Sequence, residues 1–159
     1  MDKRIDLKKK KDMRKNAEVI PKLTIDEERK YIQNYFINNN TLDERIQKMF
    51  DEEIKKKHSS YVQQDKLKKR YNSDSFITPH QIVEKMLVSK MRCYYCKSHV
   101  KIFYDKIRDD SQWTLERIDN KLAHTDSNTV ISCLDCNLKR RTRNSDHFQF
   151  AKQLVIKKI

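Results

Sequence analysis

The chain has 159 residues, of which 37% are charged and 36% are hydrophobic, and its formal net charge is +13. This balance predicts a modest core and a polyanionic partner, most simply nucleic acid. The sequence contains no glycine, which excludes the glycine-rich phosphate loops of P-loop and Rossmann proteins. No apolar stretch approaches the ~20 residues that span a bilayer, so no membrane partner is expected.

The start of the chain is basic, and no apolar signal-peptide core follows Met1. Four lysines follow one another there: Lys8, Lys9, Lys10 and Lys11. Clustered lysines of this kind contact the phosphates of nucleic acids and stay solvated without them. We therefore expect residues 1–23 to form a basic arm that is disordered until it binds.

The second region, residues 24–75, is predicted to be mainly helical. It contains two capping boxes, in which a threonine and a glutamate three residues later satisfy backbone N–H groups at the start of a helix. The boxes begin at Thr24 and Thr41, each is followed by apolar residues at helical spacing, and the first helix should end near Ile37. We expect a helical hairpin that either docks on a protein partner through residues 24–57 or packs on the remainder of the chain.

The third region, residues 76–159, is predicted to be the folded domain. Thr78 followed by proline marks the start of a helix that leads to the first cysteine. Alternation of apolar and polar residues predicts three strands: residues 100–104, 113–118 and 130–131. An apolar pattern over residues 148–159 predicts a final helix that closes over the core.

All four cysteines fall in two C-x-x-C pairs: Cys93, Cys96, Cys133 and Cys136. Without a secretory signal, this pattern favours one four-thiolate zinc site over two disulfides, in a reducing intracellular compartment such as the cytoplasm or nucleus. Two residues between cysteines let one turn supply two sulfurs to a tetrahedral ion. Four thiolates leave no position for water, so we expect the zinc to be structural and to stabilise a small core.

A polar segment lies between the cysteine pairs, and it contains Trp-Thr-Leu-Glu-Arg-Ile-Asp-Asn from Trp113 onward. With the cysteines that bracket it, the segment from Met91 to Arg143 resembles the HNH or ββα-metal endonuclease superfamily. It is most similar to the zinc-stabilised subgroup found in phages and large DNA viruses. The resemblance implies an α+β fold, with a zinc-stapled ββα-metal domain preceded by a basic, mainly helical region. It implies hydrolysis of double-stranded DNA with Mg²⁺ or Mn²⁺, and it adds the virion to the expected locations.

In that family an acidic residue and a helix residue hold one divalent ion, and a histidine beside the acid takes a proton from the attacking water. At the matching positions, the resemblance assigns the ion to Glu116 and Asn137 and the bracing of the hairpin loop to Asn128. The residue beside the acid is Arg117, which stays protonated and is a poor base.

Three alternatives follow from Arg117. His124, in the hairpin loop, is one candidate base. Alternatively, the ion activates the water and Arg117 stabilises the charge on the phosphate. In the third alternative the site is inactive, and the protein is a structural, virion or transcription-associated component that binds nucleic acid. In each case a basic run after Asn137 is expected to follow a phosphate backbone. This run contains Lys139, Arg140, Arg141 and Arg143.

Overall fold

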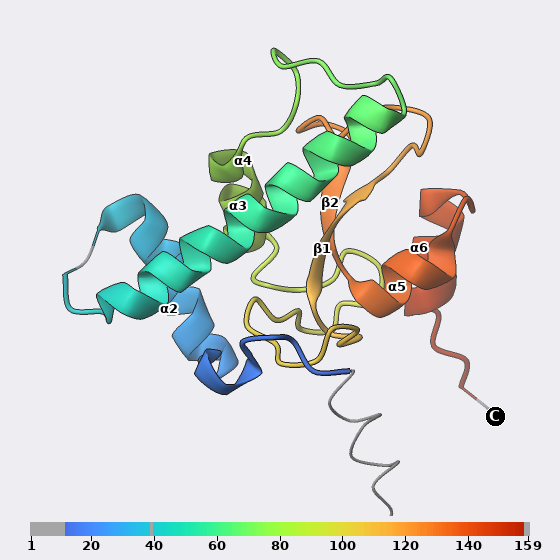
Figure 1. The fold of residues 1–159 in the computed structure, drawn as a ribbon. Helices are drawn as coiled ribbons and strands as arrows, with labels where there is room; N and C mark the ends of the chain where they lie inside the picture. Colours follow the sequence, from blue (N-terminus) through green and yellow to red (C-terminus); the bar gives the residue numbers. More distant parts are fainter. Residues whose placement is uncertain (1–11, 39, 158–159) are drawn as a thin grey trace, which may run out of the picture.

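The computed structural model describes residues 12–38 and 40–157, so the predicted contacts of Lys8, Lys9, Lys10 and Lys11 lie outside it. The described chain has an α+β fold, as predicted (Figure 1). In chain order the elements are the 3₁₀ turn η1 (Ala17–Val19), α2 (Ile25–Ile37), α3 (Glu44–Leu67), α4 (Pro79–Val88), β1 (Trp113–Arg117), β2 (Thr129–Cys133), α5 (Leu134–Arg140) and α6 (Ser145–Gln153). None of the helices in these two described stretches is long and apolar enough to cross a membrane.

Helix α2 begins with the predicted capping box. The Thr24 side chain accepts from the Glu27 N–H at 3.3 Å, and the Glu27 carboxylate accepts from the Thr24 N–H at 2.7 Å. The second predicted box is wrong, because α3 is capped by Asp43 rather than Thr41. The Asp43 carboxylate accepts at 2.8 Å from the N–H of the second residue of α3, and this satisfies one of the free donors at the helix start.

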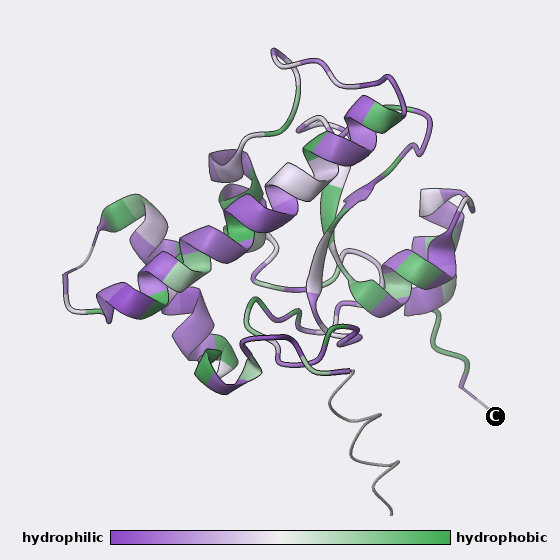
Figure 2. Cartoon of the chain, viewed as in Figure 1, coloured by the Kyte–Doolittle hydropathy of each residue, from purple (hydrophilic) through white to green (hydrophobic). Residues whose placement is uncertain are grey.

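Helix α3 is the longest element and crosses the molecule beside the β1–β2 hairpin (Figure 1). Its surface is mostly hydrophilic with isolated apolar turns (Figure 2), as expected of a helix that buries one narrow stripe. The core draws side chains from all of the packed elements: Ile32, Phe50, Ile54, Ile82, Met86, Trp113, Leu115 and Ile131. The buried apolar residues of α2 and α3 therefore pack within the chain, whereas Ile37 and Leu67 at the helix ends are exposed.

The two strands form an antiparallel hairpin in which Trp113 is paired with Cys133 and Glu116 with Val130. They fall where strands were predicted over residues 113–118 and 130–131. The predicted strand over residues 100–104 is absent, and only a single bridge joins position 101 to Gln112. The N–H groups of residues 102 and 103 donate instead to the buried carboxylate of Glu28, at 3.2 and 3.0 Å. A side chain from α2 therefore takes the hydrogen bonds that a third strand would have used.

The predicted C-terminal helix is shorter than expected. Helix α6 ends at Gln153, after which Leu154 is extended and Val155 and Ile156 are 79% and 81% exposed. Among the residues of this apolar pattern that the structure describes, only Phe148 is buried in the core. The Gln153 side chain donates to a backbone carbonyl of the first cysteine turn at 2.9 Å, which fixes the helix end there. The two β-branched residues that follow have low helix propensity.

Candidate metal centre and nuclease-like site

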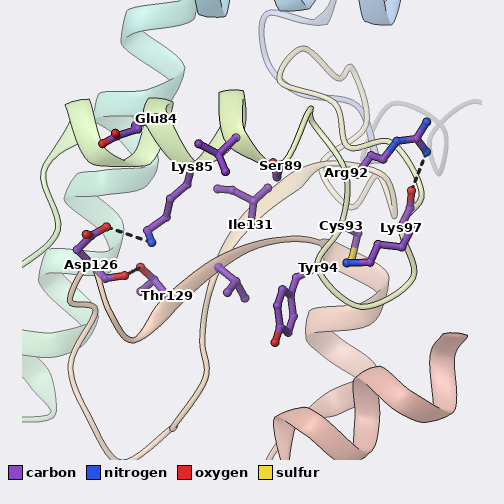
Figure 3. Close-up of a pocket in the computed structure, with 12 residues that line it drawn as sticks. Glu84, Lys85, Ser89, Arg92, Cys93, Tyr94, Lys97, Asp126, Thr129 and Ile131 are labelled. Carbon is purple, nitrogen blue, oxygen red and sulfur yellow. Dashed lines mark hydrogen bonds and ion pairs between the residues drawn. The ribbon is translucent and has the colours of Figure 1, made fainter.

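Two turns of the chain bring the cysteines together. The first lies after α4, where the Tyr94 N–H donates to the Ile131 carbonyl of β2 at 2.9 Å and fixes the turn against the strand (Figure 3). Lys97 closes this turn at a φ of 62°, a left-handed conformation that glycine usually takes. In the second turn, Cys133 ends β2 and its sulfur accepts from the Cys136 N–H at 3.4 Å, which caps α5. The two turns that carry the cysteines therefore connect α4, β2 and α5.

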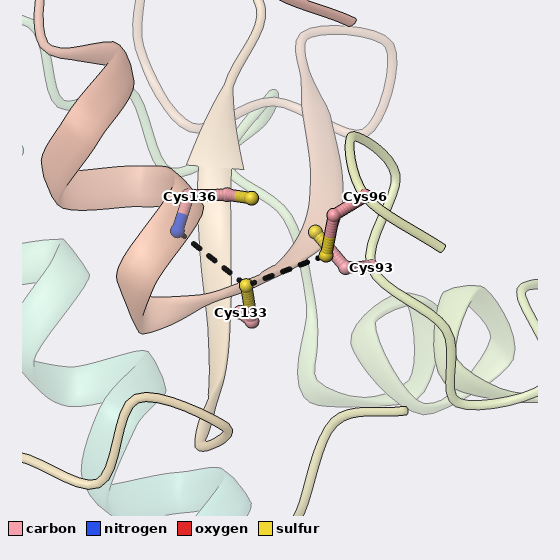
Figure 4. Close-up of side chains that lie close together, drawn as sticks. All are labelled: Cys93, Cys96, Cys133 and Cys136. Atoms are coloured by element: carbon pink, nitrogen blue, oxygen red, sulfur yellow. Dashed lines mark hydrogen bonds between the residues drawn. The ribbon is translucent and has the colours of Figure 1, made fainter. Parts of the chain in front are cut away.

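The four sulfur atoms lie within 4.8 Å of one another (Figure 4). The sulfurs of Cys96 and Cys133 are 3.9 Å apart, which matches the ~3.8 Å edge of a tetrahedron with Zn–S bonds of ~2.3 Å. Hydrogen bonding from the Cys133 thiol lowers the pKa of Cys93, which favours the thiolate form that binds metal ions. The predicted four-cysteine metal site is confirmed in its geometry, and its donor set is that of structural zinc.

Glu116 lies on β1 and is 4% exposed. Its Oε1 accepts from the Arg140 guanidinium of α5 at 2.8 Å. Its Oε2 is buried and has no hydrogen-bond partner among the residues that the structure describes. Burial raises the pKa of Glu116 to about 7, although the charge and hydrogen bond of Arg140 oppose the rise. One oxygen of this carboxylate is thus anchored, and the other is left for a ligand.

Arg140 does not lie on the basic surface where the sequence placed it, because its side chain is only 2% exposed. It follows Cys136 by one helical turn, so both side chains lie on the inner face of α5. Besides Glu116, its guanidinium donates to the carbonyls of Arg117, Ile118 and Arg143, at 2.5 to 2.9 Å. The other members of the basic run are exposed: Lys139, Arg141 and Arg143.

Asn137 lies on α5 over the same face of β1 as Glu116. Its Nδ2 donates to Thr114 Oγ1 at 3.2 Å. Thr114 and Glu116 are two residues apart on the strand, so their side chains point to the same face. Because the amide nitrogen is committed to Thr114, the Oδ1 of Asn137 is the atom available to a cation.

Asn128 lies at the end of the hairpin loop and joins three points of it. Its Nδ2 donates to the carbonyls of Asp119 and Ala123, both at 3.0 Å, and its Oδ1 accepts from the Asp119 N–H at 2.9 Å. The side chain therefore uses its full amide to hold the loop closed.

The structure places His124 and Arg117 away from α5. His124 is 3% exposed. Its ring Nδ1 lies 2.9 Å from Oδ1 of Asp65 on α3, and its backbone N–H donates to the other oxygen of the same carboxylate at 2.7 Å. The ring lies 4.9 Å from that of Tyr61. Burial lowers the pKa of His124 below its usual value, so the imidazole is neutral at pH 7. Arg117 follows Glu116 on the strand and donates to loop carbonyls at 3.1 and 3.2 Å.

The sequence interpretation missed Asp65, the partner of His124. The signal was present, because Asp65 follows Phe50, Ile54 and Tyr61 at helical spacing on the buried stripe of α3. An acidic residue in phase with such a stripe needs a buried partner. The predicted site residues thus divide into two groups. Glu116 and Asn137 lie on the facing sides of β1 and α5, whereas His124 is held against α3.

No family model matches this chain, and no curated protein or solved structure matches it either. The resemblance of residues 91–143 to the HNH superfamily therefore rests on the sequence motifs.

Proposed function

We propose that the protein is a metal-dependent endonuclease that hydrolyses DNA phosphodiester bonds beside β1 and α5. The observation that carries this proposal is the buried, unpartnered Oε2 of Glu116, on the strand face that Asn137 also covers. The strand–strand–helix order of β1, β2 and α5, joined by the cysteine cluster, supports the HNH-like reading of this unit.

The residues present fit a small divalent cation. Mg²⁺ and Mn²⁺ take hard oxygen ligands, and Glu116 Oε2 and Asn137 Oδ1 supply one carboxylate and one amide oxygen. When bound, such an ion polarises a phosphate and acidifies a coordinated water. Arg140 acts on Glu116 rather than on the substrate. It anchors Oε1 at 2.8 Å and favours the ionised carboxylate against the burial that would protonate it.

Arg117 and His124 have different roles in this proposal. Arg117 stays protonated, so it does not accept a proton. Its side chain lies on the opposite face of β1 from Glu116 and donates to loop carbonyls, so it braces the hairpin loop from within rather than contacting a phosphate at Glu116. His124 is paired with Asp65 in the interior and holds the hairpin loop against α3. An ion held by Glu116 and Asn137 would supply the activation of the water, as in the second of the three alternatives, without a contribution from Arg117.

One observation favours a second candidate, a protein that uses the same fold to bind nucleic acid without cleaving it. The guanidinium of Arg140 already pairs with the carboxylate that an ion would need, and each ion pair partner is less than 5% exposed. If this ion pair excludes a divalent cation from Glu116, the protein has no cleavage site. It would then be a zinc-stabilised, basic protein that binds nucleic acid.

Plasmid nicking by the zinc-loaded protein separates the two candidates. Nicking in Mg²⁺ or Mn²⁺ that is lost in Glu116→Gln, but retained in the exposed control Glu52→Gln on α3, is the expected result. No nicking by the wild-type protein, together with tight and salt-sensitive DNA binding, would support the second candidate instead.

A further inference from the structure

A groove of about 510 Å³ lies between α4, the first cysteine turn and β2 (Figure 3). Its apolar lining comes from Val88 of α4 and from Val130 and Ile131 of β2, and the half-buried ring of Tyr94 faces it. A groove of this size falls within the range of small-ligand sites, which are mostly apolar with a few polar groups.

The charge at the groove favours an anionic ligand. Lys85 is already paired with Asp126 at 3.0 Å, so these two charges offset each other (Figure 3). Arg92 and Lys97 are exposed at the opposite end. Arg92 donates to the Lys97 carbonyl at 3.0 Å, and the Lys97 ammonium lies 5.4 Å from the centre of the Tyr94 ring. One cation, Lys97, therefore lies beside the aromatic ring, and Arg92 is held to the same turn. Glu84 and Asp126 also line the groove, so three cationic and two acidic side chains leave it with one excess positive charge.

The groove lies one strand away from the proposed cleavage site. Val130 lines the groove and is the direct cross-strand partner of Glu116. Directly opposed residues of an antiparallel pair have their side chains on the same face, with Cβ atoms ~4.5–5.5 Å apart. A DNA strand whose phosphate lies at Glu116 therefore reaches the groove within a single nucleotide.

We propose that this groove binds one unpaired nucleotide of a DNA strand, with the base stacked on Tyr94 and the adjoining phosphate beside Arg92 and Lys97. This placement rests on the proposed function, since it takes the scissile phosphate to lie at Glu116. An aromatic face with a nearby cation is the chemistry that single-stranded nucleic acids use, and it tolerates any base. A nucleotide inside a continuous duplex is already paired and stacked, so it cannot present its face to the ring.

The test compares two DNA duplexes of the same sequence, one continuous and one with a single unpaired 2-aminopurine nucleotide. Affinity is measured by fluorescence anisotropy on zinc-loaded protein without Mg²⁺ or Mn²⁺, so that no cleavage occurs. Tyr94→Ala should weaken binding of the DNA with the unpaired nucleotide by between about fivefold and 100-fold. It should leave binding of the continuous duplex unchanged, and Tyr94→Phe should keep the wild-type affinity for both.

Tyr71 offers a matched control. It is a similarly exposed tyrosine whose ring lies 5.1 Å from the Lys66 ammonium and 5.3 Å from a neighbouring aromatic ring, but it lies outside the groove. Tyr71→Ala should bind both duplexes as the wild type does. The fluorescence of 2-aminopurine should fall on binding the wild-type protein, because stacking quenches it, and this readout does not depend on the stability of any variant. Equal effects of Tyr94→Ala on both duplexes, or no quenching by the wild type, would overturn the inference.

Cleavage assays keep this inference distinct from the proposed function. Selective, Tyr94-dependent binding in a protein that never nicks DNA would uphold the groove and reject the endonuclease. Nicking that requires Glu116, combined with binding that ignores Tyr94, would uphold the endonuclease and reject the groove.

Discussion

Replacing Arg140 with alanine tests how the end of β1 is held to α5. The change removes the hydrogen-bond partner of Glu116 Oε1 and the donors to three backbone carbonyls, in a place where both ion-pair partners are less than 5% exposed. Breaking a buried ion pair from one side costs about 3–5 kcal/mol, because the remaining charge stays buried without a partner. We therefore expect Arg140→Ala to lower the free energy of unfolding of the zinc-loaded protein by about that amount.

Urea unfolding followed by circular dichroism measures this loss, with the neighbouring exposed Arg141→Ala as the matched control. Arg141→Ala should stay within about 0.5 kcal/mol of the wild type. The double variant Glu116→Gln with Arg140→Met should lose less than Arg140→Ala alone, since it leaves no buried charge unpaired. A loss below about 1 kcal/mol for Arg140→Ala would refute the buried ion pair as described.

Three further predictions concern the zinc, the pH dependence and the DNA contacts. Removing zinc with a strong chelator should unfold residues 91–140, because such a site contributes on the order of 10 kcal/mol to folding. Unchanged circular dichroism and proteolysis after complete removal would contradict this. Burial lowers the pKa of Lys57 to about 7, whereas the unfolded chain keeps this lysine protonated to about pH 10.4. The unfolded state therefore binds more protons between these values, and this group makes stability rise with pH there. In urea unfolding between pH 7 and 9, Lys57→Met should therefore show a smaller rise of the free energy of unfolding with pH than the wild type. An equal rise in both proteins would count against the lowered pKa of Lys57. DNA affinity should fall steeply with salt, and Arg141→Ala should reduce the slope of log K against log salt by about 1. A salt-independent affinity would rule out phosphate contacts.

Local signals predicted the elements whose hydrogen bonds are made within a few residues. The capping box at Thr24 and the helix start at Thr78 are both formed, because a cap depends on side chains within a few residues. The box predicted at Thr41 is not formed, because Asp43, two residues later, takes the capping position. The cysteine cluster was equally predictable, because two C-x-x-C pairs in a reducing environment favour a single four-thiolate metal site.

The features that the sequence did not reveal depend on partners far along the chain. The strand expected over residues 100–104 is replaced by bonds to Glu28, more than 70 residues earlier. His124 is held by Asp65, 59 residues away, and Arg140 is turned inward by Glu116, 24 residues away. Periodicity identifies which face of a helix is buried, but not which charged residue from another element will meet it.

The central claim is that a divalent cation binds at Glu116 in a protein already stabilised by zinc. Titration of the zinc-loaded protein with Mn²⁺, followed by electron paramagnetic resonance, measures this directly. We predict one bound Mn²⁺ per chain in the wild type and in Glu52→Gln, and none in Glu116→Gln. A wild-type protein that binds no Mn²⁺, or a Glu116→Gln variant that binds it equally well, would contradict the account.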